Sequence, residues 1–224
     1  MAAPGKGFTN VKDQFTNGIG SVQAKVLGRR SCVRHVFLAL LCVLGLQAQE
    51  LRLQVLASSD MHGHIGATDT FSHQPHAKGW ARLATLIKAH KASNSNTLLL
   101  DCGDTIQGEP INYICNQLRP DLPEPSIAIM NALGYQAMAV GNHEFDFGME
   151  VLRKAEAQAR FPFLSANAFG SGDKKSAFPS HAKVVVGDVK VLVVGFTTPA
   201  VTRLMAPANF GNLRFDDIVE TART

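Results

Sequence analysis

The 224-residue sequence is poor in the features that mark several protein classes. It has four cysteines, one tryptophan and two tyrosines, and it contains no internal repeat or low-complexity tract. Its apolar run at 36–46 has eleven residues, well short of the roughly 20 that span a bilayer. With 46% hydrophobic and 18% charged residues, the composition is typical of one soluble globular domain with a core, and not of a disordered or fibrous protein.

The surplus of positive charge is confined to the first 48 residues. The formal net charge is +4, but this segment holds six Lys or Arg and one acid, which leaves 16 basic and 17 acidic residues in the remainder. A near-neutral body with few aromatics beyond phenylalanine lacks the general electrostatic attraction that nucleic-acid binding requires. The sequence therefore predicts no nucleic-acid partner.

Residues 29–48 have the three parts of a secretory signal. Arg29, Arg30 and Arg34 precede the apolar run, and Ala48 is a small residue suited to cleavage. The alternative, a membrane anchor, is disfavoured because the run is too short. We therefore expect export to the periplasm or the extracellular space, with no membrane span after cleavage, an unstructured extension at 1–28 and a folded part at 49–224.

Two cysteines, Cys102 and Cys115, remain in the folded part. Export would permit a disulfide, but Cys102 lies within the turn Asp101-Cys102-Gly103-Asp104. We interpret it as a small buried thiol.

Short apolar runs alternate with helical patterns along this part of the chain. Strands are predicted at 51–57, 97–100, 137–140 and 161–165, and their mostly continuous apolar character is typical of strands covered on both faces. Helical faces are predicted between them, around 80–87, 127–133 and 151–159, and a β-hairpin at 183–196 turns at Gly187-Asp188. The series indicates an α/β fold with a parallel sheet.

Polar residues follow each of the four predicted strands directly. In strand order they are Asp60 and His62, Asp101 and Asp104, Asn142 and His143, and Asn167. The carboxyl ends of neighbouring parallel strands meet at one crevice, so we expect these side chains to converge on one site.

The first two groups are suited to binding metal ions. Spacing of two in an extended segment places Asp60 and His62 on the same side, where one ion can take an oxygen and a nitrogen together. The two oxygens of Asp104 can bridge a pair of cations about 3.5–4 Å apart. Asp101, directly on the strand, is the better candidate for a structural role.

The third group combines a metal ligand with an acid–base pair. Asn142 offers a neutral carbonyl oxygen to a second cation, and His143 beside it lies within reach of a substrate bound there. Asp146 meets His143 if the stretch forms a turn, and it can then orient the imidazole toward a reacting phosphoryl group. We expect Glu144 to support this turn.

Four segments, in order, resemble the motifs of the 5'-nucleotidase family within the calcineurin-like metallophosphoesterases. They are Asp60-Met61-His62-Gly63, Gly103-Asp104, Gly141-Asn142-His143-Glu144-Phe145-Asp146 and Leu164-Ser165-Ala166-Asn167. The family includes UDP-sugar hydrolases and 2',3'-cyclic nucleotide phosphodiesterases. The resemblance implies a four-layer αββα sandwich and a small nucleotide substrate.

The resemblance also implies a role for each matching residue. Asp60 and His62 would bind a first divalent ion, Asp104 would bridge to a second, and Asn142 would bind the second. His143 and Asp146 would form the catalytic dyad. Carboxylate, amide and imidazole ligands suit Mn, Zn, Mg or Ca, so the identity of the two ions stays open.

One departure from the family pattern concerns later histidine ligands and a substrate-binding domain. After His143 the chain contains one histidine, His181, which we interpret as an ordinary surface residue. We therefore expect 49–224 to be the N-terminal portion of a catalytic domain, incomplete at its C-terminus. Two alternatives stay open: a catalytically incompetent fragment, and a thiosulfohydrolase-type member of the same fold, against which Asp146 argues.

Overall fold

The computed structural model describes residues 52–172 and 174–224. The predicted extension at 1–28 and the predicted signal at 29–48 lie outside the described residues. Within the described part, no helix combines the length and apolar character that crossing a membrane requires.

A four-stranded parallel sheet organises the fold. Its order is β1-β2-β3-β4, with β1 at Gln54–Ser58, β2 at Thr97–Asp101, β3 at Ala137–Ala139 and β4 at Phe163–Leu164. Ser58 pairs with Asp101 and Ala139 pairs with Leu164, so the carboxyl ends of the strands lie along one edge. The four predicted strands and their parallel arrangement are confirmed, and all four end within one or two residues of the predicted positions.

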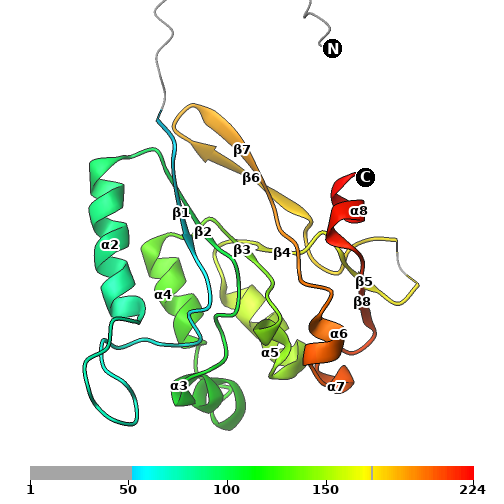
Figure 1. Cartoon of the computed structure of the whole chain (residues 1–224), viewed down its shortest axis with the longest axis horizontal. Coiled ribbons are helices and arrows are strands. Elements are labelled where there is room, and N and C mark those ends of the chain that lie inside the picture. Colours follow the sequence, from blue (N-terminus) through cyan, green and yellow to red (C-terminus); the bar gives the residue numbers. More distant parts are fainter. Residues whose placement is uncertain (1–51, 173) are drawn as a thin grey trace, which may run out of the picture. The chain divides into compact units, whose positions relative to one another are not determined.

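Three long helices connect the strands and lie side by side (Figure 1). They are α2 at Trp80–Ser93, α4 at Pro125–Leu133 and α5 at Gly148–Gln158. The predicted helical faces are confirmed, since Trp80, Ile127 and Leu152 are almost fully buried in one core with Phe163 of the sheet. Helix α4 ends where Gly134 adopts a left-handed conformation, with φ of 73°.

Two antiparallel pairs complete the described strands. The predicted hairpin is present, with β6 at His181–Val186 and β7 at Val189–Val194, and β5 at Ala168–Gly170 pairs with β8 at Leu213–Phe215. Directly after β7, Gly195 lies so close to β4 that an added Cβ would be 2.4 Å from Cβ of Leu164. The end of the hairpin is thereby fixed against the sheet.

Several short elements were not predicted from the sequence. They are α3 at Pro110–Tyr113, a π-helical turn η1 at Ile114–Leu118, α6 at Val201–Leu204, α7 at Pro207–Phe210 and α8 at Ile218–Ala222. Elements of four or five residues are too short for a hydrophobic period to be recognised. The interpretation of Cys102 as a buried thiol is wrong: its residue is exposed, whereas Cys115 is buried, and both are free.

Truncating a core residue tests this description of the fold. Leu152 is 0% exposed, so Leu152→Ala should lower the free energy of unfolding by about 2–5 kcal/mol, through lost burial and a residual cavity. Leu118→Ala is the matched control because that side chain is 61% exposed, and it should cost less than about 1 kcal/mol. Urea unfolding followed by circular dichroism measures both, and equal losses would contradict the assignment of the core.

Candidate metal centre

The loops after β1 and β2 are joined to each other by their backbones. The amide of Asp60 donates to the carbonyl of Gly103 (3.1 Å), and the amide of His62 donates to the carbonyl of Asp104 (3.0 Å). Thr105 accepts from the next amide, that of Gly63 (3.1 Å). The parallel pairing of the strands therefore continues into the loops and holds the first two groups of candidate ligands together.

The candidate ligands have an unusual backbone. In the described residues four non-glycine positions have positive φ, and three of them are Asp60 (55°), His62 (45°) and Asp104 (60°). Each such conformation costs on the order of 1–3 kcal/mol and persists only where the surroundings impose it. Gly103, with φ of 94°, is required where the loops cross, because a Cβ there would lie 2.5 Å from the amide nitrogen of Gly141.

The side chains of His62, Asp104 and His143 converge. Each offers one potential ligand atom, and these three atoms lie within 4.8 Å of one another. Oδ1 of Asp60 is 4.0 Å from Nε2 of His62. Nδ1 of His62 donates to the backbone oxygen of Gln107 (3.1 Å), which leaves Nε2 as the ligating nitrogen.

This set of donors fits a divalent cation. Two atoms that each lie about 2.1 Å from one ion are at most about 4.2 Å apart. The distance of 4.0 Å between Oδ1 of Asp60 and Nε2 of His62 is within this limit. Three ligand atoms that lie within 4.8 Å of one another can be shared by one ion or by a close pair of ions. Asn142 is partly buried beside His143, and its side-chain amide forms no hydrogen bond within residues 52–172 and 174–224. Its role as a ligand stays a prediction.

The contact predicted between His143 and Asp146 is present. The 3-10 turn at His143–Phe145 brings the two side chains together, and Nδ1 of His143 donates to Oδ2 of Asp146 (2.8 Å). Asn209 of α7 donates to the backbone oxygen of Asp146 (2.9 Å) and supports it from behind. Nε2 of His143 is left to face the crevice, where its ring lies edge-on to His62 at 5.0 Å.

The charges around His143 favour its protonated form. Partial burial disfavours the imidazolium, but the hydrogen bond and charge of Asp146, with the charges of Asp104 and Glu144, outweigh burial and raise the pKa of His143 above its ordinary value. The ring is therefore suited to donating a hydrogen bond from Nε2 to an anionic group.

A convergent set of carboxylate and imidazole donors at the end of a parallel sheet agrees with what comparison with known proteins finds. Residues 53–219 match the family described as Calcineurin-like phosphoesterase. The chain belongs to that family. The predicted family and the predicted fold class are both confirmed.

Relatives of this calcineurin-like phosphoesterase chain are named for nucleotide chemistry. The trifunctional nucleotide phosphoesterase YfkN of Bacillus subtilis is 34% identical over 78% of this chain and 13% of that protein. A 2',3'-cyclic-nucleotide 2'-phosphodiesterase/3'-nucleotidase of Yersinia enterocolitica is 33% identical over 79% of this chain and 29% of its own length. The crystal structure of a 5'-nucleotidase precursor from Thermus thermophilus has a TM-score of 0.62 and 35% identity, over 76% of this chain and 33% of that one. The chain thus spans less than a third of the length of these two curated relatives.

Glu144 connects the loops of this phosphoesterase site. Its side chain is fully buried, and its carboxylate accepts from the amides of Asp104 (2.8 Å), Thr105 (2.7 Å) and Gly141 (2.7 Å). Burial raises the pKa of Glu144 to about 7, against the opposing effect of these amides. Its expected role in supporting the turn is confirmed, and the structure extends that role to the loop after β2.

Asp101 has the structural role expected of it. It is buried and accepts from the hydroxyls of Ser58 (2.5 Å) and Thr105 (3.0 Å) and from the amide of Gly103 (2.9 Å). Burial raises the pKa of Asp101 to about 6. It fixes the loop that carries Asp104.

The expectation that Asn167 joins the crevice is wrong. Its side chain is 0% exposed and forms a clamp, accepting from the amide of Thr197 (2.9 Å) and donating to the carbonyls of Thr197 (2.8 Å) and Asp216 (2.9 Å). The chain after β7 covers the end of β4, so the asparagine joins two covering segments and does not face solvent.

The histidines outside the cluster include His64, His76 and His181. His76 is partly buried with its ring 5.7 Å from that of His64, and Nδ1 of His64 lies 2.6 Å from a carboxylate oxygen of Glu109. His181 is exposed, as predicted.

A buried polar pair that was not predicted from the sequence lies behind the loop after β1, which carries Asp60 and His62. Asn112 and Glu124 are both 0% exposed and are joined by a hydrogen bond of 2.6 Å, and Glu124 also caps α4 through the amide of Ile127 (2.7 Å). Oδ1 of Asn112 lies so close to Gly63 that a Cβ added to Gly63 would be 1.5 Å from this oxygen. The pair therefore supports the loop that carries His62. Glu124 before Pro125 at a helix start was the available sequence signal.

Replacing Glu144 tests its role in joining the loops. Glu144→Gln keeps the volume but turns an NH2 group toward backbone amides, so it should lower the free energy of unfolding by about 2–3 kcal/mol and weaken Mn²⁺ binding. Urea unfolding and calorimetric Mn²⁺ titration measure the two effects. Glu150→Gln, an exposed residue of α5, is the control. Equal behaviour of the two variants would refute the role.

The pH dependence of stability tests the burial of Glu124. Burial raises the pKa of Glu124 to about 7, against hydrogen bonds from Ile127 and Asn112 and the charge of Lys154. Because the folded pKa exceeds the ordinary value of 4.5, the stabilisation is complete below pH 4.5 and is lost as the pH rises through 7. Relative to Glu124→Gln, wild type should lose up to roughly 3 kcal/mol between pH 5 and 8. Urea unfolding in EDTA measures the difference, which a pH-independent value would contradict.

Proposed function

We propose that residues 49–224 form the N-terminal portion of the catalytic domain of an exported, metal-dependent hydrolase of nucleotide phosphoesters. The observation that supports this most directly is the convergence of the ligand atoms of His62, Asp104 and His143 within 4.8 Å. His143 is in turn hydrogen-bonded to Asp146 at 2.8 Å. The names of the relatives support a 5'-nucleotidase or 2',3'-cyclic phosphodiesterase type of activity, and the family resemblance adds a UDP-sugar hydrolase type. Export rests on the signal predicted at 29–48.

The ligand loops would hold two divalent ions, Mn, Zn, Mg or Ca. Asp60 and His62 bind the first, Asp104 is shared and Asn142 binds the second. Ions bound there supply Lewis acidity to phosphoryl oxygens and make a water acidic enough to be a nucleophile. The loops, which are hydrogen-bonded to one another and have positive φ at Asp60, His62 and Asp104, contribute by keeping the donors in place before the substrate arrives.

The dyad would act on the phosphoryl group. Nε2 of His143 donates a hydrogen bond to a phosphoryl oxygen and stabilises the negative charge that develops during transfer. Asp146 keeps the proton on Nδ1, fixes the direction of Nε2 and favours the imidazolium. The observed contact between Asp146 and His143 supports the nucleotidase type over the thiosulfohydrolase type.

One observation supports the alternative that this chain alone is catalytically incompetent. In the described residues one group of three His, Cys, Asp or Glu side chains meets the geometry of a metal site, and three ligands are fewer than two fully coordinated ions require. Calorimetric titration with Mn²⁺ separates the possibilities. Tight binding of two equivalents by the 224-residue chain would exclude the incompetent fragment.

Phosphate release from AMP in the presence of Mn²⁺ tests the function itself. In a full-length form of the protein, the double variant His143→Ala, Asp104→Asn should lose at least about 100-fold in kcat/KM, because it removes a metal ligand and the phosphoryl hydrogen bond. His181→Ala, an exposed histidine outside the site, is the matched control and should keep its activity. Equal activity of the double variant and wild type would refute the proposal.

A further inference from the structure

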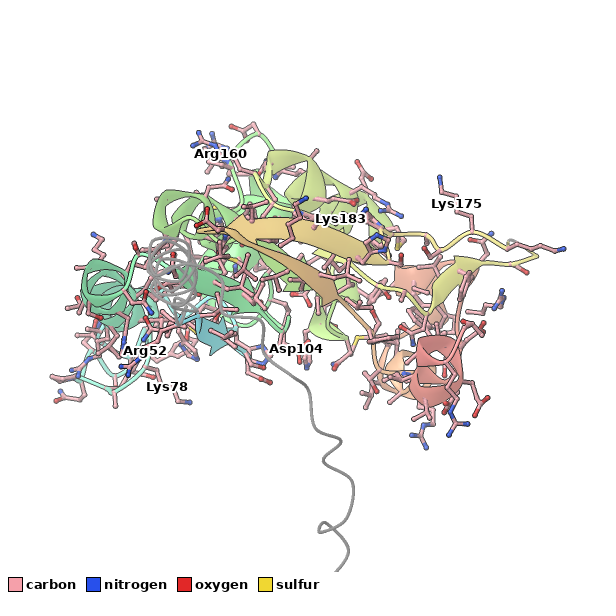
Figure 2. The ribbon with its side chains drawn as sticks, turned by 90° about the horizontal axis from the view of Figure 1, so that it is seen from above. Arg52, Lys78, Asp104, Arg160, Lys175 and Lys183 are labelled. Atoms are coloured by element: carbon pink, nitrogen blue, oxygen red, sulfur yellow. The ribbon has the colours of Figure 1, made fainter. Side chains whose placement is uncertain are left out.

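A hollow adjoins the first ligand loop on its outer side. It has a volume of about 480 Å³ and is lined by Asp60 and His62 together with Lys78, Arg82 and Leu86 of the next segment and of α2. Lys78 lies on the same side of the molecule as Asp104, away from Arg160 and Lys183 (Figure 2). A group bound at the ligand loop therefore has direct access to this hollow.

The two cations of the hollow have no counter-charge in the part of the chain that the structure describes. Lys78 and Arg82 are exposed, and neither forms an ion pair or a side-chain hydrogen bond with a described residue. Other arginines are paired at close range: Arg119 with Asp121, Arg153 with Glu156 and Arg223 with Glu220. Among the described residues, the one acid that lines the hollow is Asp60, a candidate metal ligand. The hollow is thus a cationic extension of an otherwise acidic site.

We propose that Lys78 and Arg82 bind a second phosphoryl group of the substrate, next to the one held at the metal centre. The inference rests on the proposed function and narrows its substrate class to nucleoside diphosphates and related diphosphate esters. An adjacent phosphoryl group is one bridging oxygen away from the group at Asp60 and His62, so it enters the hollow beside them. Arg82 has the planar donors that match phosphate oxygens, and Lys78 adds a point charge.

The remaining lining residues argue against another occupant. Within 52–172 and 174–224, no phenylalanine, tyrosine or tryptophan lines the hollow, and its two rings are the imidazoles of His62, a candidate metal ligand, and His64, which contacts Glu109. Met61, Leu83 and Leu86 supply the large apolar side chains that line the hollow. A compact dianion fits these features better than a base or a sugar does.

Binding of two ligands that differ by one phosphoryl group tests the inference. The probes are AMP and non-hydrolysable α,β-methylene-ADP, titrated calorimetrically into the 224-residue chain in excess Mn²⁺. Wild type should bind the diphosphate analogue about tenfold or more tightly than AMP, because one or two charged hydrogen bonds contribute a difference in affinity of that size. In Lys78→Gln, Arg82→Gln the ratio of the two dissociation constants should fall close to one. Lys88→Gln, an exposed lysine of α2 that does not line the hollow, should keep the wild-type ratio.

The outcomes separate this inference from the function on which it rests. If AMP binding requires Mn²⁺ and is lost in Asp104→Asn, but wild type shows no preference for the diphosphate, the inference fails and the proposed function stands. A preference for the diphosphate that persists in Lys78→Gln, Arg82→Gln also overturns the inference, because other residues then bind the second phosphoryl group. If neither ligand binds in Mn²⁺, the inference is overturned, and the proposed function is decided by the AMP assay of the full-length form. Thermal unfolding of the variants verifies that these exposed substitutions leave the fold intact.

Discussion

The arrangement of the site depends on a single buried carboxylate. Glu144 takes hydrogen bonds from amides of the loop after β2 and of the loop after β3, and these loops carry Asp104 and His143. Oδ1 of Asp104 in turn accepts from the amide of His143 (2.9 Å). The loop after β1 is bonded to the loop after β2 through its backbone, so the Glu144 contacts position all three segments.

This arrangement places many negative groups close together. Asp60, Asp101, Asp104 and Glu144 lie around or beneath the crevice, and in the described residues none of them is paired with a lysine or arginine. The imidazole of His143, whose pKa is raised, supplies part of the compensating charge. A site built in this way is costly without cations and gains stability when they bind, so we expect metal binding and the rigidity of the loops to be coupled. Lys78 and Arg82, which have no ion pair among residues 52–172 and 174–224, place positive charge beside this negative site.

Much of the fold follows from local sequence pattern. The apolar runs at β1 and β2 and the period of α2, α4 and α5 indicate the parallel sheet. The position of a residue just after a strand predicts where it meets the others. That rule brought Asp60, His62, Asp104, His143 and Asp146 to one edge. It failed for Asn167, because the segment after β7 that covers it comes 30 residues later and leaves no local signal. The pairing of Asn112 with Glu124 was missed because a cap signal at Glu124 does not identify a partner 12 residues away, and the contact of His64 with Glu109 also joins distant positions.

The most direct test of the central claim is the position of a bound ion. Crystals of the chain soaked in Mn²⁺ give an anomalous difference map that locates the metal without reference to activity. The account predicts a peak about 2.0–2.2 Å from the carboxylate of Asp104 and from Nε2 of His62, with Glu144 still bonded to the amides of both loops. Peaks confined to other parts of the surface, or a crevice in which Asp104 binds no ion, would contradict it.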